Sequence, residues 1–157
     1  MTARTILISA LVLWATSFNG VTAQPAPQIR LDSLRIQLLY ETSGTLSPNI
    51  APPATFTLFN STIGEGDARE PASDVLISVV VTSSAAQANL TRPVVLTVRG
   101  RGGRVLARRS FDGVFVTSRR AVRSLLAQDI TCAGPVTIEA TYGTQRKTAT
   151  LNFLCGE

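Results

Sequence analysis

The stretch CAGPVTIEATYGTQRKTATLNFLC, residues 132–155, decides the fold, because it holds two alternating strands around a short turn. Apolar side chains recur at every second position, and this period is typical of a half-buried strand. A two-residue turn at 143–144 would set the register of the hairpin. The predicted pairs are Tyr142 with Gln145, Ile138 with Ala149 and Val136 with Leu151. A slip of one residue would place Ile138 opposite a threonine and break the apolar face.

The same register places Cys132 opposite Cys155, and these are the two cysteines of the chain. We interpret them as a structural disulfide; a redox or metal pair is the alternative. Counted from a two-residue turn, residues 132 and 155 form a hydrogen-bonded pair, whose α-carbons lie farther apart than those of a non-hydrogen-bonded pair. We therefore expect a β-bulge near residues 133–134 that adjusts this distance. Closing a loop of about 24 residues should stabilise the fold by roughly 3 kcal/mol.

The N-terminus has the three parts of a secretory signal peptide: Arg4, an apolar run at 6–15, and small residues before Ala23. That run is about half of the ~20 residues that a membrane-spanning helix needs. We therefore expect residues 1–23 to be a cleaved signal peptide, with the protein in the periplasm or secreted. No later apolar stretch is long enough to span a membrane.

Cleavage would leave residues 24–157, whose size suits one domain. We expect an extended leader at 24–30 and a single domain at 31–157. The basic residues of the chain are almost all arginines, with Lys147 as the one lysine. This bias is typical of a bacterium with a GC-rich genome.

Alternating apolar runs and turn residues recur along the rest of the chain, which predicts an all-β fold. The expected strands are 34–41, 55–59, 75–82, 93–99, 104–111, 114–116, 137–142 and 148–154. Ser118 would cap a short helical segment in which Val122, Leu125 and Leu126 share a face. The best fit is an immunoglobulin-like two-sheet sandwich of about seven or eight strands, with one short helical turn and a C-terminal disulfide-linked hairpin.

Catalytic motifs are absent from the sequence. Histidine does not occur, which removes the commonest general base and metal ligand. The Gly-x-Ser-x-Gly and Ser-x-x-Lys nucleophile motifs are also missing. We therefore predict a protein that is not an enzyme and that uses no metal and no cofactor; a hydrolase with an unreadable site is the alternative.

An acidic loop lies at residues 64–74. Its carboxylates belong to Glu65, Asp67, Glu70 and Asp74. Clustered oxygens can hold calcium, but the spacing matches no known calcium loop and Arg69 lies among them. A solvated loop is the simpler interpretation, and contact with a basic surface is the alternative.

Nine arginines and a single acid occur between Arg92 and Arg123. The candidate anion-binding residues are Arg99, Arg101, Arg104, Arg108 and Arg109. Such a cluster would attract the phosphates, sulfates or carboxylates of a glycan or a lipid head group. The simpler interpretation is a charged strand edge that resists aggregation. Nucleic acid is not expected, because no aromatic residue is interleaved with the five candidate arginines between Arg99 and Arg109.

Residues 59–74, which read FNSTIGEGDAREPASD, resemble a segment of short exported bacterial proteins of unknown function. At the level of the fold alone, the chain resembles small periplasmic immunoglobulin-like sandwiches that chaperone or inhibit fibre subunits, such as curli assembly inhibitors. These resemblances name no activity for the chain, and the second rests on the fold and on no shared motif.

The leading hypothesis from the sequence is a non-enzymatic exported module that contacts another envelope or secreted protein. Strand addition at a sheet edge, or contacts made by loops, would be its mechanism. Binding of an anionic glycan or lipopolysaccharide through the arginine-rich hairpin is the alternative.

Overall fold

The computed structural model describes residues 25–154, so the predicted signal peptide at 1–23 and Cys155 lie outside the described residues. Within this range the chain forms nine strands and one 3-10 turn. The strands are β1 (Ile29–Leu39), β2 (Asp74–Ser83), β3 (Gln87–Asn89), β4 (Val94–Arg99), β5 (Val105–Phe111), β6 (Phe115–Thr117), β7 (Arg120–Ala127), β8 (Pro135–Tyr142) and β9 (Gln145–Asn152); the turn is η1 (Arg101–Gly103).

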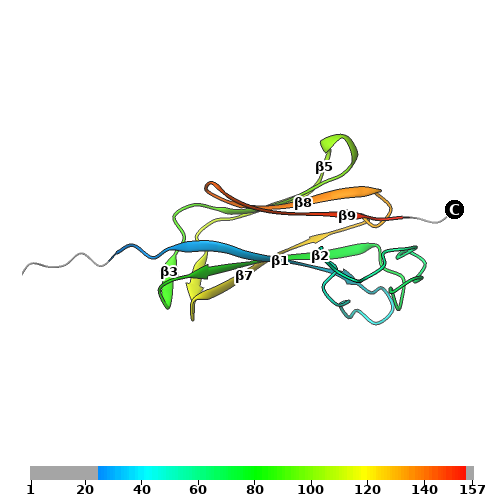
Figure 1. The fold of residues 1–157 in the computed structure, drawn as a ribbon, viewed down its shortest axis with the longest axis horizontal. Coiled ribbons are helices and arrows are strands. Elements are labelled where there is room, and N and C mark those ends of the chain that lie inside the picture. Colours follow the sequence, from blue (N-terminus) through cyan, green and yellow to red (C-terminus); the bar gives the residue numbers. More distant parts are fainter. Residues whose placement is uncertain (1–24, 155–157) are drawn as a thin grey trace, which may run out of the picture.

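The strands form two antiparallel sheets that pack face to face (Figure 1). The five-stranded sheet has the order β1-β2-β7-β6-β3, and the four-stranded sheet has the order β5-β4-β8-β9. The predicted all-β, two-sheet architecture is confirmed. In the described part of the chain, no helix is long and apolar enough to cross a membrane.

The core lies between the sheets, because alternate side chains of each strand point inward. Ile36 and Ile77 of the larger sheet are fully buried, as are Leu96 and Ile138 of the smaller one. Burying one such side chain stabilises the fold by about 1.5–3 kcal/mol. These inward positions fix the register of every strand pair and leave the outer faces and edges to carry function.

The hairpin of β8 and β9 has the predicted register. Tyr142 pairs with Gln145, Ile138 with Ala149 and Val136 with Leu151. The ladder ends at the pair of Pro135 and Asn152, and the chain turns at residues 131–134. The bulge expected at 133–134 is therefore wrong, since β8 does not reach these residues. The pairing of Cys132 with Cys155 stays a prediction, because Cys155 is not described.

The short helix predicted after Ser118 is wrong, because these residues form strand β7. Ser118 and Arg119 have positive φ values of 51° and 63°, which two-residue hairpin turns require. They reverse the chain between Thr117 and Arg120, which pair directly. Leu125 points into the core while Leu126 points outward, so the real period is two rather than 3.6.

Residues 55–59 do not form the predicted strand. Their side chains alternate as a strand's would, with Phe56 and Leu58 packed against the core, but the only bridge joins Phe59 to Leu154. Strand β1 also begins at Ile29, inside the leader predicted at 24–30. The short strand β3 was not predicted, because Gln87-Ala88-Asn89 contains no β-branched or aromatic residue, unlike the equally short β6.

Candidate functional site

The free edge of β1 is covered by the loop that follows it. Ile36 donates its N–H to Oδ1 of Asn49 at 2.8 Å, and Leu38 donates to Oγ of Ser47 at 2.9 Å. In return, Ile50 and Ser47 donate their own N–H groups to the carbonyls of Ile36 and Leu38 at 2.8 and 3.0 Å. The loop therefore takes the place of a neighbouring strand, partly with side chains.

The N-terminal half of the β1 edge is covered in a second way, by one side chain of the β8–β9 turn. Oε1 of Gln145 accepts from the N–H of Leu31 at 2.9 Å, and Nε2 of Gln145 donates to the carbonyl of Ile29 at 2.7 Å. A single amide group thus reproduces the paired donor and acceptor of a β-ladder.

The outer edge of β7 has no such cover among the described residues. Strand β6 pairs with β7 only at Thr117 and Arg120, next to the two-residue turn. In this kind of hairpin the residues that flank the turn point their N–H and C=O groups at each other. By alternation, the same groups of Val122, Ser124 and Leu126 point toward the side that β6 leaves open. Among the described residues, the one hydrogen bond on this side runs from the guanidinium of Arg123 to the carbonyl of Val122, at 2.8 Å.

The outer face beside this edge is apolar around a polar centre. Leu126 pairs with Leu76, and Val122 pairs with Val80. The side chains of Val122 and Leu126 are 43% and 41% exposed. Between these two pairs, the hydroxyls of Ser78 and Ser124 bond to each other at 2.8 Å. An added strand would find both backbone partners and apolar side-chain contacts here.

One edge of the smaller sheet is formed by β5 and the other by β9. The β5 edge has a different character from β7. Arg108 and Arg109 lie side by side on it and are both exposed. The register shifts between Val98 and Arg99, where β4 pairs with β5. Charged side chains and irregular pairing are the usual means of keeping an edge from adding another strand.

Strand β7 also carries two arginines, Arg120 and Arg123, but its pairing with β2 has no register shift, and Val122 and Leu126 are exposed beside it. We therefore regard β7, not β5, as the candidate binding edge.

The five predicted anion-binding arginines do not form one cluster. Arg108 and Arg109 are successive residues of a strand and point to opposite faces of the sheet. Arg109 lies over the ring of Phe111, with Cζ 4.9 Å from the ring centroid. Arg99 donates to the carbonyl of Gly103 at 3.3 Å. Arg101 and Arg104 are exposed in the connection between β4 and β5.

The four carboxylates of the acidic loop are also separated, because each holds a different backbone or side-chain group. Their hydrogen bonds are Glu65 with Nδ2 of Asn60 at 2.7 Å, Asp67 with the N–H of Thr57, Glu70 with the N–H of Ser43 at 2.9 Å, and Asp74 with the N–H of Asp129 at 3.1 Å. Among residues 25–154, no three acidic, histidine or cysteine side chains are arranged to hold a metal. The loop carboxylates fasten chain segments together.

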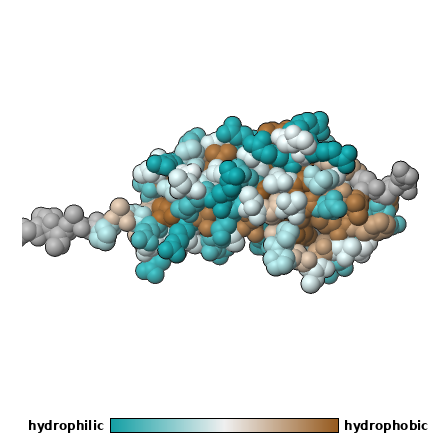
Figure 2. All heavy atoms as spheres, turned by 45° about the horizontal axis from the view of Figure 1, so that its top comes forward, coloured by the Kyte–Doolittle hydropathy of each residue, from teal (hydrophilic) through white to brown (hydrophobic). Residues whose placement is uncertain are grey.

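Hydrophobic side chains are also exposed at the end of the molecule where residues 40–73 lie. Figure 2 shows hydrophobic residues gathered toward this end, while hydrophilic residues dominate much of the remaining visible face. Ile63 is 58% exposed, and the bridged pair Phe59 and Leu154 are 48% and 50% exposed.

No protein-family model matches this sequence, and no curated protein matches it either.

The difference between the two edges of the larger sheet escaped the sequence analysis. Asn49 and Ser47 lie next to Pro48, and their side chains bond the backbone of β1 as a neighbouring strand would. Their residue types alone do not indicate this role. The open edge was hidden because residues 118–126 were assigned to a helix. The positive-φ pair at 118–119 was the feature that could have indicated the hairpin, but serine and arginine are not its usual residues.

Proposed function

We propose that this protein is a non-enzymatic, exported binding module that takes up an extended segment of another exported protein along β7. The observation that carries the proposal is the open edge of β7 at Val122, Ser124 and Leu126. In strand addition, backbone hydrogen bonds supply affinity and alternate side chains supply specificity. The exposed side chains of Val122 and Leu126 beside the edge would contact those side chains.

The covered edge of β1 supports the choice of β7. The sheet has β1 and β3 as its formal edge strands, and β1 has its outward groups bonded over most of its length. Strand β3 has three residues, too few for a stable ladder. The open part of β7 is longer and carries apolar side chains.

A site-specific photo-crosslinker tests this proposal. It would replace Leu126 on β7 and, in the matched control, Val105 on β5, which is similarly exposed at 47%. We expect a defined crosslinked product with an exported protein from position 126 and none from position 105. Equal products from both positions, or none from either in the native exported fraction, would reject β7 as the binding edge.

We also propose the finer features of the fold: an immunoglobulin-like arrangement and a disulfide between Cys132 and Cys155. The passage of the chain from β5 in one sheet to β6 in the other supports the first. The register of β8 and β9 supports the second, because the ladder of Pro135 and Asn152 brings the flanking segments together. An intact mass lower by two hydrogen atoms than that of the reduced protein would test the disulfide.

A second candidate function is anion binding by the connection between β4 and β5. Arg101 and Arg104 are exposed there, and neither forms an ion pair with another described residue. Binding to heparin and lipopolysaccharide at low and moderate salt, compared with a variant in which Arg99, Arg101 and Arg104 are serine, tests this function. Binding that the variant retains would exclude the arginines of the hairpin.

A further inference from the structure

A groove runs along the loops that cover β1. It consists of two adjoining cavities of about 520 and 430 Å³, and Pro48 and Arg69 line both of them. Each volume lies within the range of small-molecule sites in proteins. The larger cavity continues toward Phe56 and the smaller one toward Leu46.

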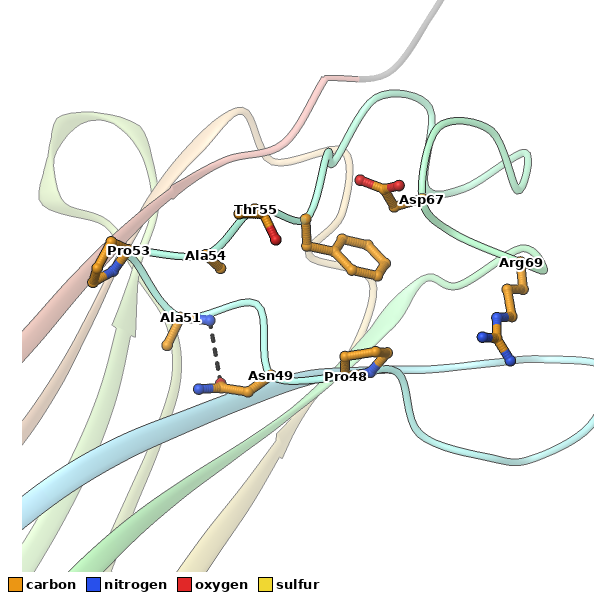
Figure 3. Close-up of a pocket in the computed structure, with 9 residues that line it drawn as sticks. Pro48, Asn49, Ala51, Pro53, Ala54, Thr55, Asp67 and Arg69 are labelled. Carbon is orange, nitrogen blue, oxygen red and sulfur yellow. Dashed lines mark hydrogen bonds between the residues drawn. The ribbon is translucent and has the colours of Figure 1, made fainter.

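Two loop segments form the walls of the larger cavity. Figure 3 shows Pro48, Asn49 and Ala51 along one side, with Asp67 and Arg69 on the segment that faces them. Oδ1 of Asn49 accepts hydrogen bonds from the N–H groups of Ile36 and Ala51. The Nδ2 group of the same amide remains as a donor for a ligand. The walls are thus fixed by hydrogen bonds before any ligand arrives.

The opposite wall is fastened to the end of β1. Tyr40 is buried, and its hydroxyl accepts from the N–H of Arg69 at 3.4 Å. The N–H of Glu41 donates to the carbonyl of Pro71 at 2.9 Å. These contacts hold the backbone at 69–71 beside β1, so that the Arg69 side chain projects from a fixed position.

The charges of the groove are unequally engaged. The carboxylates of Asp67 and Glu70 are held in place by hydrogen bonds from backbone N–H groups and keep their negative charge, so an anionic ligand must contact the arginines directly. The guanidinium groups of Arg35 and Arg69 are exposed, and neither forms an ion pair or hydrogen bond with another described residue. Each guanidinium can therefore bind a carboxylate with two parallel hydrogen bonds.

The remaining lining narrows the class of ligand. The N–H groups of Ile36 and Leu38 are already bonded to the covering loop, so a peptide would find no strand edge here. The groove instead offers side-chain polar groups, such as the amide of Asn49 and the hydroxyl of Thr55, beside the half-buried ring of Phe56. Scattered hydrogen-bonding groups next to an apolar ring suit the hydroxyls and ring faces of a sugar.

We propose that this groove binds an acidic oligosaccharide whose uronate carboxylates pair with Arg69 and Arg35. The site is separate from the strand-addition edge, because β2 lies between β1 and β7 in the sheet. Failure of one proposal therefore leaves the other standing.

Calorimetric titration of the purified protein with tetragalacturonate and with a hyaluronan tetrasaccharide tests the groove. Cellotetraose serves as the neutral probe and tetraglutamate as the acidic peptide. We expect at least one acidic sugar to bind, and Arg69→Gln to weaken that binding by about tenfold, the loss expected for a charge-assisted contact. Arg30→Gln, at an exposed arginine that lies outside both the groove and the connection between β4 and β5, is the matched control and should leave the affinity within about twofold.

Each other outcome overturns the proposal. Binding of neither acidic sugar rejects the site, and equal binding of cellotetraose rejects the role of the arginines. Tighter binding of tetraglutamate, with the same dependence on Arg69, would identify an acidic peptide as the ligand. A loss with Arg101→Gln but not with Arg69→Gln would move anion binding to the connection between β4 and β5.

Discussion

The two long edges exposed by the larger sheet differ in how their backbone groups are used. Along β1, Gln145 bonds the N–H of Leu31 and the C=O of Ile29, and the loop at 47–50 bonds the N–H and C=O groups of Ile36 and Leu38. Along β7, beyond the pairing of Arg120 with Thr117, only the guanidinium of Arg123 meets an outward carbonyl within the described residues. The outward backbone groups are therefore largely hydrogen-bonded along β1 and largely open along β7. The fold does not cover its edges as a general property.

This contrast explains why the covering loop lies over β1. An exposed strand edge is a template for pairing with another chain, and β1, with eleven residues, would be the longest template in the protein. The covering loop removes that risk, and its outer surface forms the groove around Arg69. The shorter template on β7 stays available for a partner.

The largest expected effect comes from uncovering β1 with Asn49→Ala. Its Oδ1 atom serves the N–H groups of both Ile36 and Ala51, and each donor left without a partner costs about 1–3 kcal/mol. Because Ala51 is partly exposed, we expect the free energy of unfolding to fall by about 2–4 kcal/mol in urea denaturation. Asn152→Ala, at an exposed position on β9, should change it by less than about 0.5 kcal/mol. Equal effects from the two variants would show that the loop does not hold the edge.

A second prediction tests the alternation on β7 with two neighbouring prolines. The N–H of Arg123 points toward β2 and that of Val122 toward the open side, as the pairing of Thr117 with Arg120 requires. Proline at position 123 removes a ladder hydrogen bond to β2, whereas proline at position 122 removes none. Arg123→Pro should therefore lower the free energy of unfolding by about 1–3 kcal/mol more than Val122→Pro. The reverse order in urea denaturation would place the open side of β7 wrongly.

Sequence patterns predicted the parts of the fold whose side chains report burial directly. The hairpin of β8 and β9 was predicted pair by pair, because inward residues such as Ile138 and Ala149 alternate on both sides of the Gly143 turn. The hairpin of β4 and β5 was predicted for the same reason. In these regions the local period and the tertiary packing agree.

Prediction failed where the packing overrides the local pattern. Val122, Leu125 and Leu126 have a spacing that suits a helix. In the structure Leu126 lies on the exposed outer face of the sheet, away from the core. The groove was not predicted either, since Arg69 comes next to Pro48 only through the hydrogen bonds of Tyr40 and Asn49. Contacts between distant segments leave no period in the sequence.

A third, smaller effect concerns the other half of the covered edge. Gln145→Ala removes one acceptor from the N–H of Leu31 and one donor from the carbonyl of Ile29. Both groups lie near the partly exposed start of β1, where water can replace the amide, so we expect a loss of about 1–2 kcal/mol in unfolding free energy. The N–H of Leu31 should also exchange with solvent faster. Thr144→Ala, at the exposed turn position next to it, is the control, and an unchanged exchange rate in Gln145→Ala would contradict this role.

The smallest expected effect on stability is at the open edge, where it sharpens the comparison most. Leu126→Lys adds a positive charge to the apolar part of the open edge, next to those that Arg120 and Arg123 already give to β7. Leu126 is 41% exposed, so the free energy of unfolding should change by no more than about 0.5 kcal/mol. The charge would nevertheless oppose strand addition, and a crosslinker at Val122 should then yield less product. Val105→Lys on β5 should leave that yield unchanged. If Leu126→Lys destabilises the protein strongly, the outer face of β7 is part of the packing, and the two edges are less different than their hydrogen bonds indicate.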